Sequence, residues 1–264
     1  MDQALLQSLV EFLSYRGPDS GHFWMDGSIG LGHAMLRTTL ESLGERQPAN
    51  LDGRFWITAD ARLDGRAEFI AELERSGRVV RANAPDSELI LHAYATWGTP
   101  SVEHLRGDFS FALWDAQNKQ LFCARDHFGI KPFYYLERGD LFLFSNTLNC
   151  IRMHPEVSSE LNEAAIGDFL LFGLNCDNAA TSFRDIQRLP PAHSLSISPE
   201  GVKIRRYWTP PTDGRIRYAK PETYIENFQS LLEAAVADRL RTDRAGILLG
   251  GGLDSSAVAA VAKE

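Results

Sequence analysis

A glycine-rich segment in the last part of the chain carries the residues best suited to chemistry. The run Ile247-Leu248-Leu249-Gly250-Gly251-Gly252-Leu253-Asp254-Ser255-Ser256 is typical of an apolar strand that turns tightly and begins a helix at Asp254 or Ser255. Glycines let backbone N–H groups approach a ligand, and a helix start adds unsatisfied donors and partial positive charge. The pattern therefore favours bound phosphate. Close packing of a helix on a strand is the alternative, but aspartate beside two hydroxyls suits Mg²⁺ and phosphate oxygens better than a core.

The loop differs from the Walker-type nucleotide loop, because it lacks the lysine that precedes the final hydroxyl residue. It resembles the pyrophosphate loop of ATP pyrophosphatases, which split ATP into AMP and pyrophosphate. This resemblance implies ATP and Mg²⁺ as cofactors, with Asp254 as the metal ligand and Leu249 near the adenosine. Gly250 replaces the first serine of that loop, which removes one hydroxyl donor. The ATP-binding residues that the resemblance implies are Leu249, Gly251, Gly252, Leu253, Asp254, Ser255 and Ser256.

The elements upstream of this loop read as an α+β arrangement. Three-and-four apolar spacing predicts helices over 3–13, 66–76 and 87–97, the last capped by Asp86 or Ser87 and stopped by Gly98. Short apolar runs between turn residues predict strands, and two pairs of them predict hairpins. Strand pairs and helices in separate runs indicate a layered domain that ends near residue 200. The predicted strands cover 22–25, 29–31, 55–59, 108–114, 120–124, 133–137 and 141–145.

A proline-rich link at residues 209–214 is the clearest boundary in the sequence. A helix predicted over 222–241 follows it and leads into the apolar strand and the glycine loop. A helix, a strand and a second helix are typical of the beginning of a parallel α/β domain, and such a sheet needs more strands to bury both faces. We therefore expect a layered domain over 1–208, a linker over 209–221 and an N-terminal piece of a second domain over 222–264.

Composition favours an ordinary acidic enzyme. The 264 residues are 44% apolar and carry a net charge of −8, which does not favour nucleic acid as a partner. Cys123, Cys150 and Cys176 have neither a pairing number nor metal spacing, so we expect buried thiols in a reducing compartment. The histidines also lack ligand spacing. The sequence shows no membrane-spanning run and no signal pattern, which predicts a cytoplasmic protein.

Several motifs in one order resemble glutamine-hydrolysing asparagine synthetase. The resemblance implies a class II glutamine amidotransferase domain, an α/β/β/α sandwich of two stacked sheets between helices, followed by an ATP-pyrophosphatase synthetase domain. In that family a carboxylate is activated as its acyl-AMP, and an amine then displaces AMP to leave an amide. The motifs, besides the glycine loop, are Arg16-Gly17-Pro18-Asp19, Leu31-Gly32-His33, Leu105 to Asp115, Ala124 to Tyr135, Leu189-Pro190-Pro191 and Tyr207-Trp208.

The amidotransferase site departs from the family pattern at nearly every functional position. Met1 is followed by Asp2, so the cysteine nucleophile and the first strand are expected to be absent, and no catalytic residue is assigned. Met35 stands where an arginine would clamp the glutamine carboxylate, and Asp60-Ala61 replace the Asn-Gly pair of the oxyanion hole. Only Asp86 matches the residue that would hold the glutamine α-amine. A helix N-cap explains this vestigial glutamine-binding aspartate equally well.

Two functional hypotheses follow. The first is an AMP-forming amide ligase with an inactive glutaminase domain, similar to the β-lactam synthetases and lasso-peptide macrocyclases, acting on a small-molecule or peptide carboxylate. The second is a non-catalytic scaffold or split half that docks a separate C-terminal synthetase subunit. Because loss of the first strand exposes a sheet edge, self-association is also expected. The charged run from Arg125 to Tyr135 is interpreted as a structural bend that an Arg125–Asp126 ion pair ties together.

Overall fold

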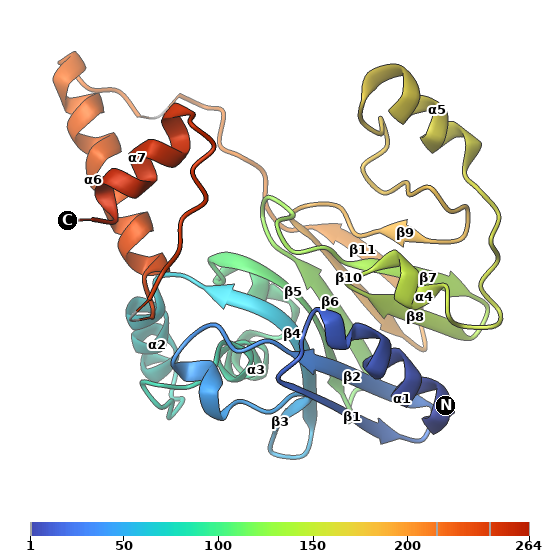
Figure 1. Cartoon of the computed structure of the whole chain (residues 1–264). Helices are drawn as coiled ribbons and strands as arrows, with labels where there is room; N and C mark the ends of the chain where they lie inside the picture. Colours follow the sequence, from blue (N-terminus) through green and yellow to red (C-terminus); the bar gives the residue numbers. More distant parts are fainter. Residues whose placement is uncertain (1, 215, 243, 264) are drawn as a thin grey trace.

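The computed structural model of the chain describes residues 2–214, 216–242 and 244–263. A six-stranded antiparallel sheet occupies its centre, with the strand order β11-β10-β6-β5-β4-β3 (Figure 1). Successive strands β3 to β6 are neighbours, whereas β10 returns to pair with β6. The strands are β3 Ala49–Leu51, β4 Phe55–Leu63, β5 Gly107–Asp115, β6 Gln120–Arg125, β10 His193–Ser198 and β11 Gly201–Arg206.

The hairpin of β5 and β6 shows why this sheet forms. Its predicted strands are confirmed, and the polar turn between them places Lys119 in the left-handed region, at φ 49°. Alternation sends Phe109 and Phe111 into the core under the helices, while Ala112 faces the second sheet. Both faces of the central sheet are therefore buried by different layers.

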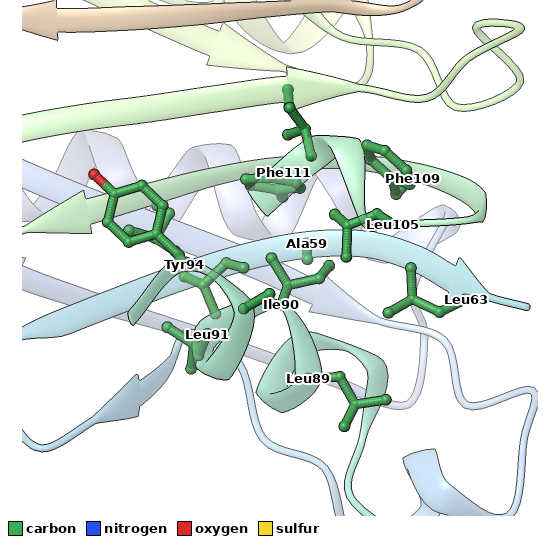
Figure 2. Close-up of a cluster of buried hydrophobic side chains, with 14 of the residues drawn as sticks. Ala59, Leu63, Leu89, Ile90, Leu91, Tyr94, Leu105, Phe109 and Phe111 are labelled. Atoms are coloured by element: carbon green, nitrogen blue, oxygen red, sulfur yellow. The ribbon is translucent and has the colours of Figure 1, made fainter. Parts of the chain in front are cut away.

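Two helices, α2 (Arg66–Arg75) and α3 (Asp86–Trp97), cover one face of the central sheet. Figure 2 shows Ile90 of α3 beside Phe109 and Phe111 of β5, all fully buried or nearly so. Each such side chain contributes roughly 1.5–3 kcal/mol when removed from water. Gly98 ends α3 at φ 65°, as predicted, but the predicted N-cap is wrong, because Pro85 occupies that position.

A second layer of strands lies against the other face. It consists of a two-stranded sheet, β1 (Ser20–Asp26) with β2 (Ile29–Met35), and a three-stranded sheet in the order β8-β7-β9. Trp24 of β1 stacks on Trp56 of β4 with ring centroids 4.3 Å apart. β1, β2 and β4 all extend beyond the short runs predicted for them. The remaining strands are β7 Tyr134–Arg138, β8 Leu141–Ser145 and β9 Gln187–Arg188.

Helix α1 (Gln3–Phe12) covers the β1–β2 sheet from outside. Asp2 caps it by accepting hydrogen bonds from the first-turn amides, and Leu6 and Val10 are its buried residues. The contact is so close that a Cβ at Gly32 would lie 2.5 Å from Val10 Cγ2. Helices outside two stacked sheets make the predicted α/β/β/α sandwich. The other helices here are α4 Leu148–Ile151 and α5 Glu163–Phe172, with short 3₁₀ turns η1 Leu13–Tyr15, η2 Glu41–Gly44 and η3 Thr99–Glu103.

The C-terminal part contains α6 (Pro221–Arg239) and α7 (Leu253–Val261), which lie apart from the sheets in Figure 1. The strand predicted at 247–249 is wrong: these residues are irregular, and Leu248 is 97% exposed. A parallel strand exists only beside other strands, and the described part of the chain places none there. In residues 2–214, 216–242 and 244–263, no helix is long and apolar enough to cross a membrane.

Cys123 and Cys150 are free and buried, as expected, but Cys176 is exposed, so the expectation of buried thiols fails for this residue. It lies in the loop that follows α5 rather than in a core strand, where packing would cover it.

Candidate functional site

A cavity of about 450 Å³ lies between the two sheets of the second layer. Strand β2 lines one side with residues from Gly30 to Met35, and β8 lines the other with Phe142 to Ser145, while α1 contributes an apolar wall. Since β2 pairs only with β1, and β8 only with β7, among the described strands, each has an unpaired edge beside this space. At its far end the cavity reaches Asp60 and Asp86.

Asp86 is 8% exposed at the beginning of α3, and it does not cap that helix. Its carboxylate instead accepts a hydrogen bond of 3.1 Å from the backbone amide of Leu63, at the end of β4. Arg66, the first residue of α2, forms an ion pair with the same carboxylate. Both oxygens of the Asp86 carboxylate thus contact residues outside α3, and the helix-cap explanation for this aspartate is wrong.

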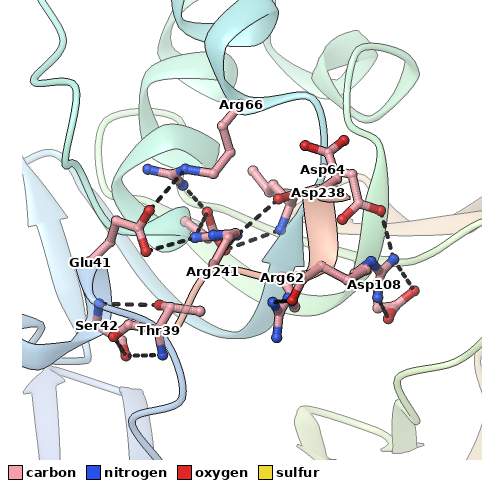
Figure 3. A network of polar contacts seen from close by, with 12 residues as sticks. Thr39, Glu41, Ser42, Arg62, Asp64, Arg66, Asp108, Asp238 and Arg241 are labelled. Atoms are coloured by element: carbon pink, nitrogen blue, oxygen red, sulfur yellow. Dashed lines mark hydrogen bonds and ion pairs between the residues drawn. The ribbon is translucent and has the colours of Figure 1, made fainter. Parts of the chain in front are cut away.

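A second arginine reaches Asp86 from far along the chain. Arg241 follows α6 and places Nη1 3.2 Å from Asp86 Oδ2, while its Nη2 lies 3.1 Å from Glu41 Oε2 (Figure 3). Burial alone lowers the pKa of Arg241, but the two carboxylates outweigh it and raise the pKa above its ordinary value. For Glu41, burial raises the pKa, yet hydrogen bonds from its own amide and from Arg241 leave the pKa below its ordinary range. Both groups therefore stay charged.

The Asp60-Ala61 pair lies on β4, where the oxyanion-hole motif was expected. Asp60 Oδ1 is 2.6 Å from Lys131 Nζ, and each side chain is about one-third exposed. Ala61 pairs with Phe109 across the sheet. The negative charge that the sequence predicts at this position is real, but a lysine from the loop before β7 compensates it.

His33 and Met35 lie on β2 at the cavity wall. His33 Nδ1 is 3.0 Å from the hydroxyl of Thr58, and burial lowers the pKa of the imidazole to about 4, with Asp60 opposing the shift. The ring is therefore neutral at physiological pH. Met35 is buried and supplies no positive charge for a carboxylate.

The Arg125 to Tyr135 segment is a bend, but the predicted ion pair does not tie it. Arg125 donates to the carbonyls of Lys131, Leu189 and Gly129 at 2.5–2.8 Å. Asp126 accepts hydrogen bonds from three backbone amides within the bend itself. No salt bridge joins Arg125 to Asp126 in the described structure. The Arg125 guanidinium binds backbone carbonyls and the Asp126 carboxylate binds backbone amides. These hydrogen bonds fix the loop that carries Lys131.

The glycine loop turns tightly just before α7, although the described residues directly before it form no strand. Gly251 is left-handed, at φ 77°, Gly252 is the N-cap of α7, and a Cβ at either would meet nothing within 4 Å. The first N–H groups of a helix lack intrahelical acceptors, so the donor set fits a phosphate. The hydroxyls of Ser255 and Ser256 donate instead to the carbonyl of Gly252, at 3.4 and 2.8 Å, and must rotate to reach a ligand.

Asp254 lies exposed in the first turn of α7, close to these donors. No group of three or more His, Cys, Asp or Glu side chains that could hold a metal occurs among the described residues. A metal at Asp254 therefore needs oxygen ligands from a nucleotide or from water, which is usual for Mg²⁺. Leu249 is exposed just before the loop.

The sequence analysis missed Arg241 and Arg66, which bind Asp86, and Lys131, which binds Asp60 at the cavity wall. Each lies far in sequence from the carboxylate that it contacts, or separated from it by a turn. The excess of carboxylates at 60, 64 and 86 was the one available signal, because buried carboxylates require cationic partners.

Known protein families match both parts of the chain. Residues 1–208 match the family described as glutamine amidotransferase domain, and residues 227–264 match the family described as asparagine synthase. Asparagine synthetase [glutamine-hydrolyzing] 3 of Bacillus subtilis (strain 168) is 31% identical over 265 residues, covering 99% of this chain and 42% of that protein. Asparagine synthetase [glutamine-hydrolyzing] 2 of the same organism is 30% identical over 272 residues, covering 98% and 36%.

The layered fold is that of a class II glutamine amidotransferase domain, and residues 227–264 match the asparagine synthase family. The chain belongs to the asparagine synthetase family. It spans less than half the length of the two relatives named above. The solved structure of the allosteric regulatory enzyme of purine biosynthesis is similar over 68% of this chain and 35% of its own, with a TM-score of 0.47 and 16% identity, and nothing about the site follows from a similarity at that level.

Proposed function

We propose that the chain is the N-terminal portion of an ATP-dependent, AMP-forming amide ligase whose amidotransferase domain does not hydrolyse glutamine. The observation that carries this proposal is the occupation of Asp86, the one matching glutamine-site residue, by the guanidinium groups of Arg66 and Arg241. A glutamine α-ammonium would have to displace them. Met35 offers no clamp for the glutamine carboxylate, and the Asp60–Lys131 pair stands where amide donors are needed.

In the proposed synthetase reaction, a carboxylate oxygen attacks the α-phosphorus of ATP, which forms acyl-AMP and releases pyrophosphate. An amine then attacks the acyl carbon, and AMP leaves. Backbone N–H groups of Gly251, Gly252 and Leu253 would hold the β- and γ-phosphates, with the hydroxyls of Ser255 and Ser256. Mg²⁺, when bound through Asp254, would neutralise the leaving pyrophosphate. Leu249 would lie beside the adenosine. Gly250 lacks the serine hydroxyl of the family loop, and the lost hydrogen bond weakens the free energy of ATP binding by on the order of 1 kcal/mol.

Glutamate release is the direct test of the inactive amidotransferase site. The purified chain is incubated with glutamine, with and without Mg-ATP, and glutamate is quantified by a coupled dehydrogenase assay. We expect no release above the no-enzyme rate. Enzyme-dependent release that saturates with glutamine concentration would overturn the proposal.

A second function, a scaffold or split half that docks a separate synthetase subunit, is favoured by exposed apolar side chains on α6. Tyr224, Ile225, Phe228 and Leu231 are between 43 and 67% exposed. A patch of this kind is typical of a surface that packs against more protein. The unpaired edges of β2 and β8 offer a further place for self-association or a partner strand.

Pyrophosphate–ATP exchange separates the two functions. The chain is assayed alone and together with a C-terminal synthetase half, with carboxylate substrates in both cases. Exchange only in the combined sample supports a ligase portion. Exchange by neither sample, with formation of a stable complex, supports the scaffold. Cyclisation of a peptide or β-amino acid precursor without added amine would identify a cyclase of the lasso-peptide or β-lactam type.

A further inference from the structure

Two arginines at the end of α6 enter a cluster of four carboxylates on the amidotransferase domain (Figure 3). Arg239 Nη2 lies 2.6 Å from Asp64 Oδ2, and its Nη1 lies 2.5 Å from Asp108 Oδ2. Arg241 spans Glu41 and Asp86, as described above, and also donates to the carbonyl of Leu63 at 3.0 Å. On one side the cluster gathers residues from η2, from the turn after β4, from α3 and from β5, and on the other side from a single short segment.

Backbone and side-chain hydrogen bonds add to these ion pairs. Asp238 accepts a hydrogen bond of 2.9 Å from the amide of Gly65, and Arg62 donates to the carbonyl of Arg239. The end of α6 and the residues that follow it are thus held at three positions, Asp238, Arg239 and Arg241.

The rest of α6 contributes little apolar contact. Among its described residues only Val236 is buried, while most of its large apolar side chains are exposed. Charge and hydrogen bonding, rather than hydrophobic burial, therefore fix this helix to the amidotransferase domain. Figure 1 shows the C-terminal end of α6 beside α2, with the rest of the helix pointing away.

Charge balance explains why the segment stays in place. Among the ion pairs of the described residues, Asp64 and Asp108 pair only with Arg239, whereas Glu41 and Asp86 each pair with both Arg66 and Arg241. Removing one partner of a largely buried pair leaves an uncompensated charge, which is far more costly than the pair itself is favourable. In the docked state, each of the four carboxylates has an arginine partner from the segment at the end of α6.

We propose that the acidic cluster of Glu41, Asp64, Asp86 and Asp108 is an interdomain latch, in which Arg239 and Arg241 fix the segment leading to the glycine loop. Arg241 binds Asp86, the carboxylate that the family resemblance assigns to an amino-acid ammonium. The contacts alone support this inference, so it holds whether or not the proposed ligase activity is found. A docked Arg241 and a bound α-ammonium exclude each other at Asp86.

Hydrogen exchange of the full chain tests the latch. The double variant Arg239→Ala/Arg241→Ala is compared with the wild type and with the control Arg205→Ala. Arg205 lies on strand β11, and its replacement removes an exposed ion pair with Glu103. We expect amides at 234–242 to exchange about tenfold faster or more in the double variant, while strands β4 to β6 keep their protection. The control should match the wild type. Unchanged exchange at 234–242 in the double variant overturns the latch.

Two further arms keep the test decisive if the double variant folds poorly. Arg239→Glu combined with Asp108→Arg reverses one pair, and we expect it to recover protection that Arg239→Glu alone loses; no recovery contradicts the pairing. In the wild type, raising salt from about 0.1 M to about 1 M shortens the Debye length from about 10 Å to about 3 Å and should accelerate exchange at 234–242 before the central sheet. Salt-independent exchange there also contradicts an electrostatic latch.

Discussion

Lys131 Nζ lies 2.6 Å from Asp60 Oδ1, on a loop that Arg125 and Asp126 hold rigid through backbone contacts. The carboxylate of Asp60 is therefore part of an ion pair that lines the cavity rather than an isolated charge. Each side chain is about one-third exposed, so solvent screens the pair and its net contribution to stability is at most about 1 kcal/mol.

Restoring the family's amide at this position should not restore glutamine hydrolysis. In Asp60→Asn, and in Asp60→Asn combined with Met35→Arg, we expect no glutamate release, because Arg66 and Arg241 still occupy Asp86. The coupled glutamate assay measures this, with an active relative as positive control. Saturable glutamate formation by either variant would show that the amine site is accessible after all.

The partly buried imidazole of His33 should make the fold sensitive to acid. Its pKa in the folded chain is lowered to about 4, so between pH 4 and 6.5 the unfolded chain binds a proton that the folded chain does not. Stability from this group is complete above pH 6.5 and is lost as pH falls towards 4. The full effect is about 3 kcal/mol at most, at roughly 1.4 kcal/mol per pKa unit.

Denaturant unfolding of the wild type and of His33→Gln at several pH values measures this contribution. The difference between the two proteins isolates His33 from the carboxylates that titrate in the same range. We expect the wild type to lose more stability than His33→Gln between pH 6.5 and 4. Parallel pH profiles for the two proteins would mean that folding does not lower the pKa of His33.

Gly17 should tolerate no side chain. A Cβ there would lie 2.1 Å from the backbone oxygen of Ala34 on β2, which cannot move without disturbing the strand. We expect Gly17→Ala to lower the free energy of unfolding by about 1–3 kcal/mol or more. Gly44→Ala is the matched control, since nothing lies within 4 Å of its Cβ position. Equal stability of the two variants would contradict the close approach.

Asp254 should be essential for ATP chemistry but not for folding. Its side chain is exposed at the start of α7, so Asp254→Ala should leave the unfolding midpoint unchanged. In a sample combined with a C-terminal synthetase half, we expect pyrophosphate–ATP exchange to fall on the order of a hundredfold, because Mg²⁺ loses a ligand. In Asp254→Asn, which keeps one oxygen ligand, the exchange rate should fall less. Exchange that is insensitive to both changes rules out the metal role.

The unpaired edges of β2 and β8 should promote association at high concentration. Sedimentation velocity over a range of concentrations is expected to show reversible dimers, because unpaired edges recruit strands. Gly30→Pro on β2 removes one N–H from that edge strand and should weaken association, with Gly44→Ala as control. A strictly monomeric chain at the highest concentration would argue that these edges are closed in solution.

Local pattern predicted the elements whose burial is set by neighbours in sequence. The alternation that places Phe109 and Phe111 on one face correctly predicted the β5–β6 hairpin, and Gly98 correctly predicted the end of α3. The strand at 247–249 was wrong because its apolar residues form a strand only between other strands. Arg241 could not be foreseen at Asp86, because the two lie 155 residues apart and charge alone does not specify which arginine closes a pair.

The same limitation applies to the Arg125 to Tyr135 segment. Its charges were expected to bind each other, as adjacent opposite charges often do. The bend instead turns carbonyls towards Arg125 and amides towards Asp126, and charged groups form strong hydrogen bonds with such backbone groups. The geometry of the turn determines which backbone groups Arg125 and Asp126 bind, and residue types alone do not predict that geometry.

The Trp24–Trp56 stack has a practical consequence for watching this protein fold. The two indoles come from different layers of the sandwich and lie 4.3 Å apart, with their ring planes inclined by 15°. Rings so close couple their electronic transitions, so separation of the layers should change the near-ultraviolet circular dichroism and the tryptophan emission together. The chain thus carries an intrinsic optical probe of contact between its two sheets, and Trp24→Phe should silence that signal while leaving the other tryptophans as a background.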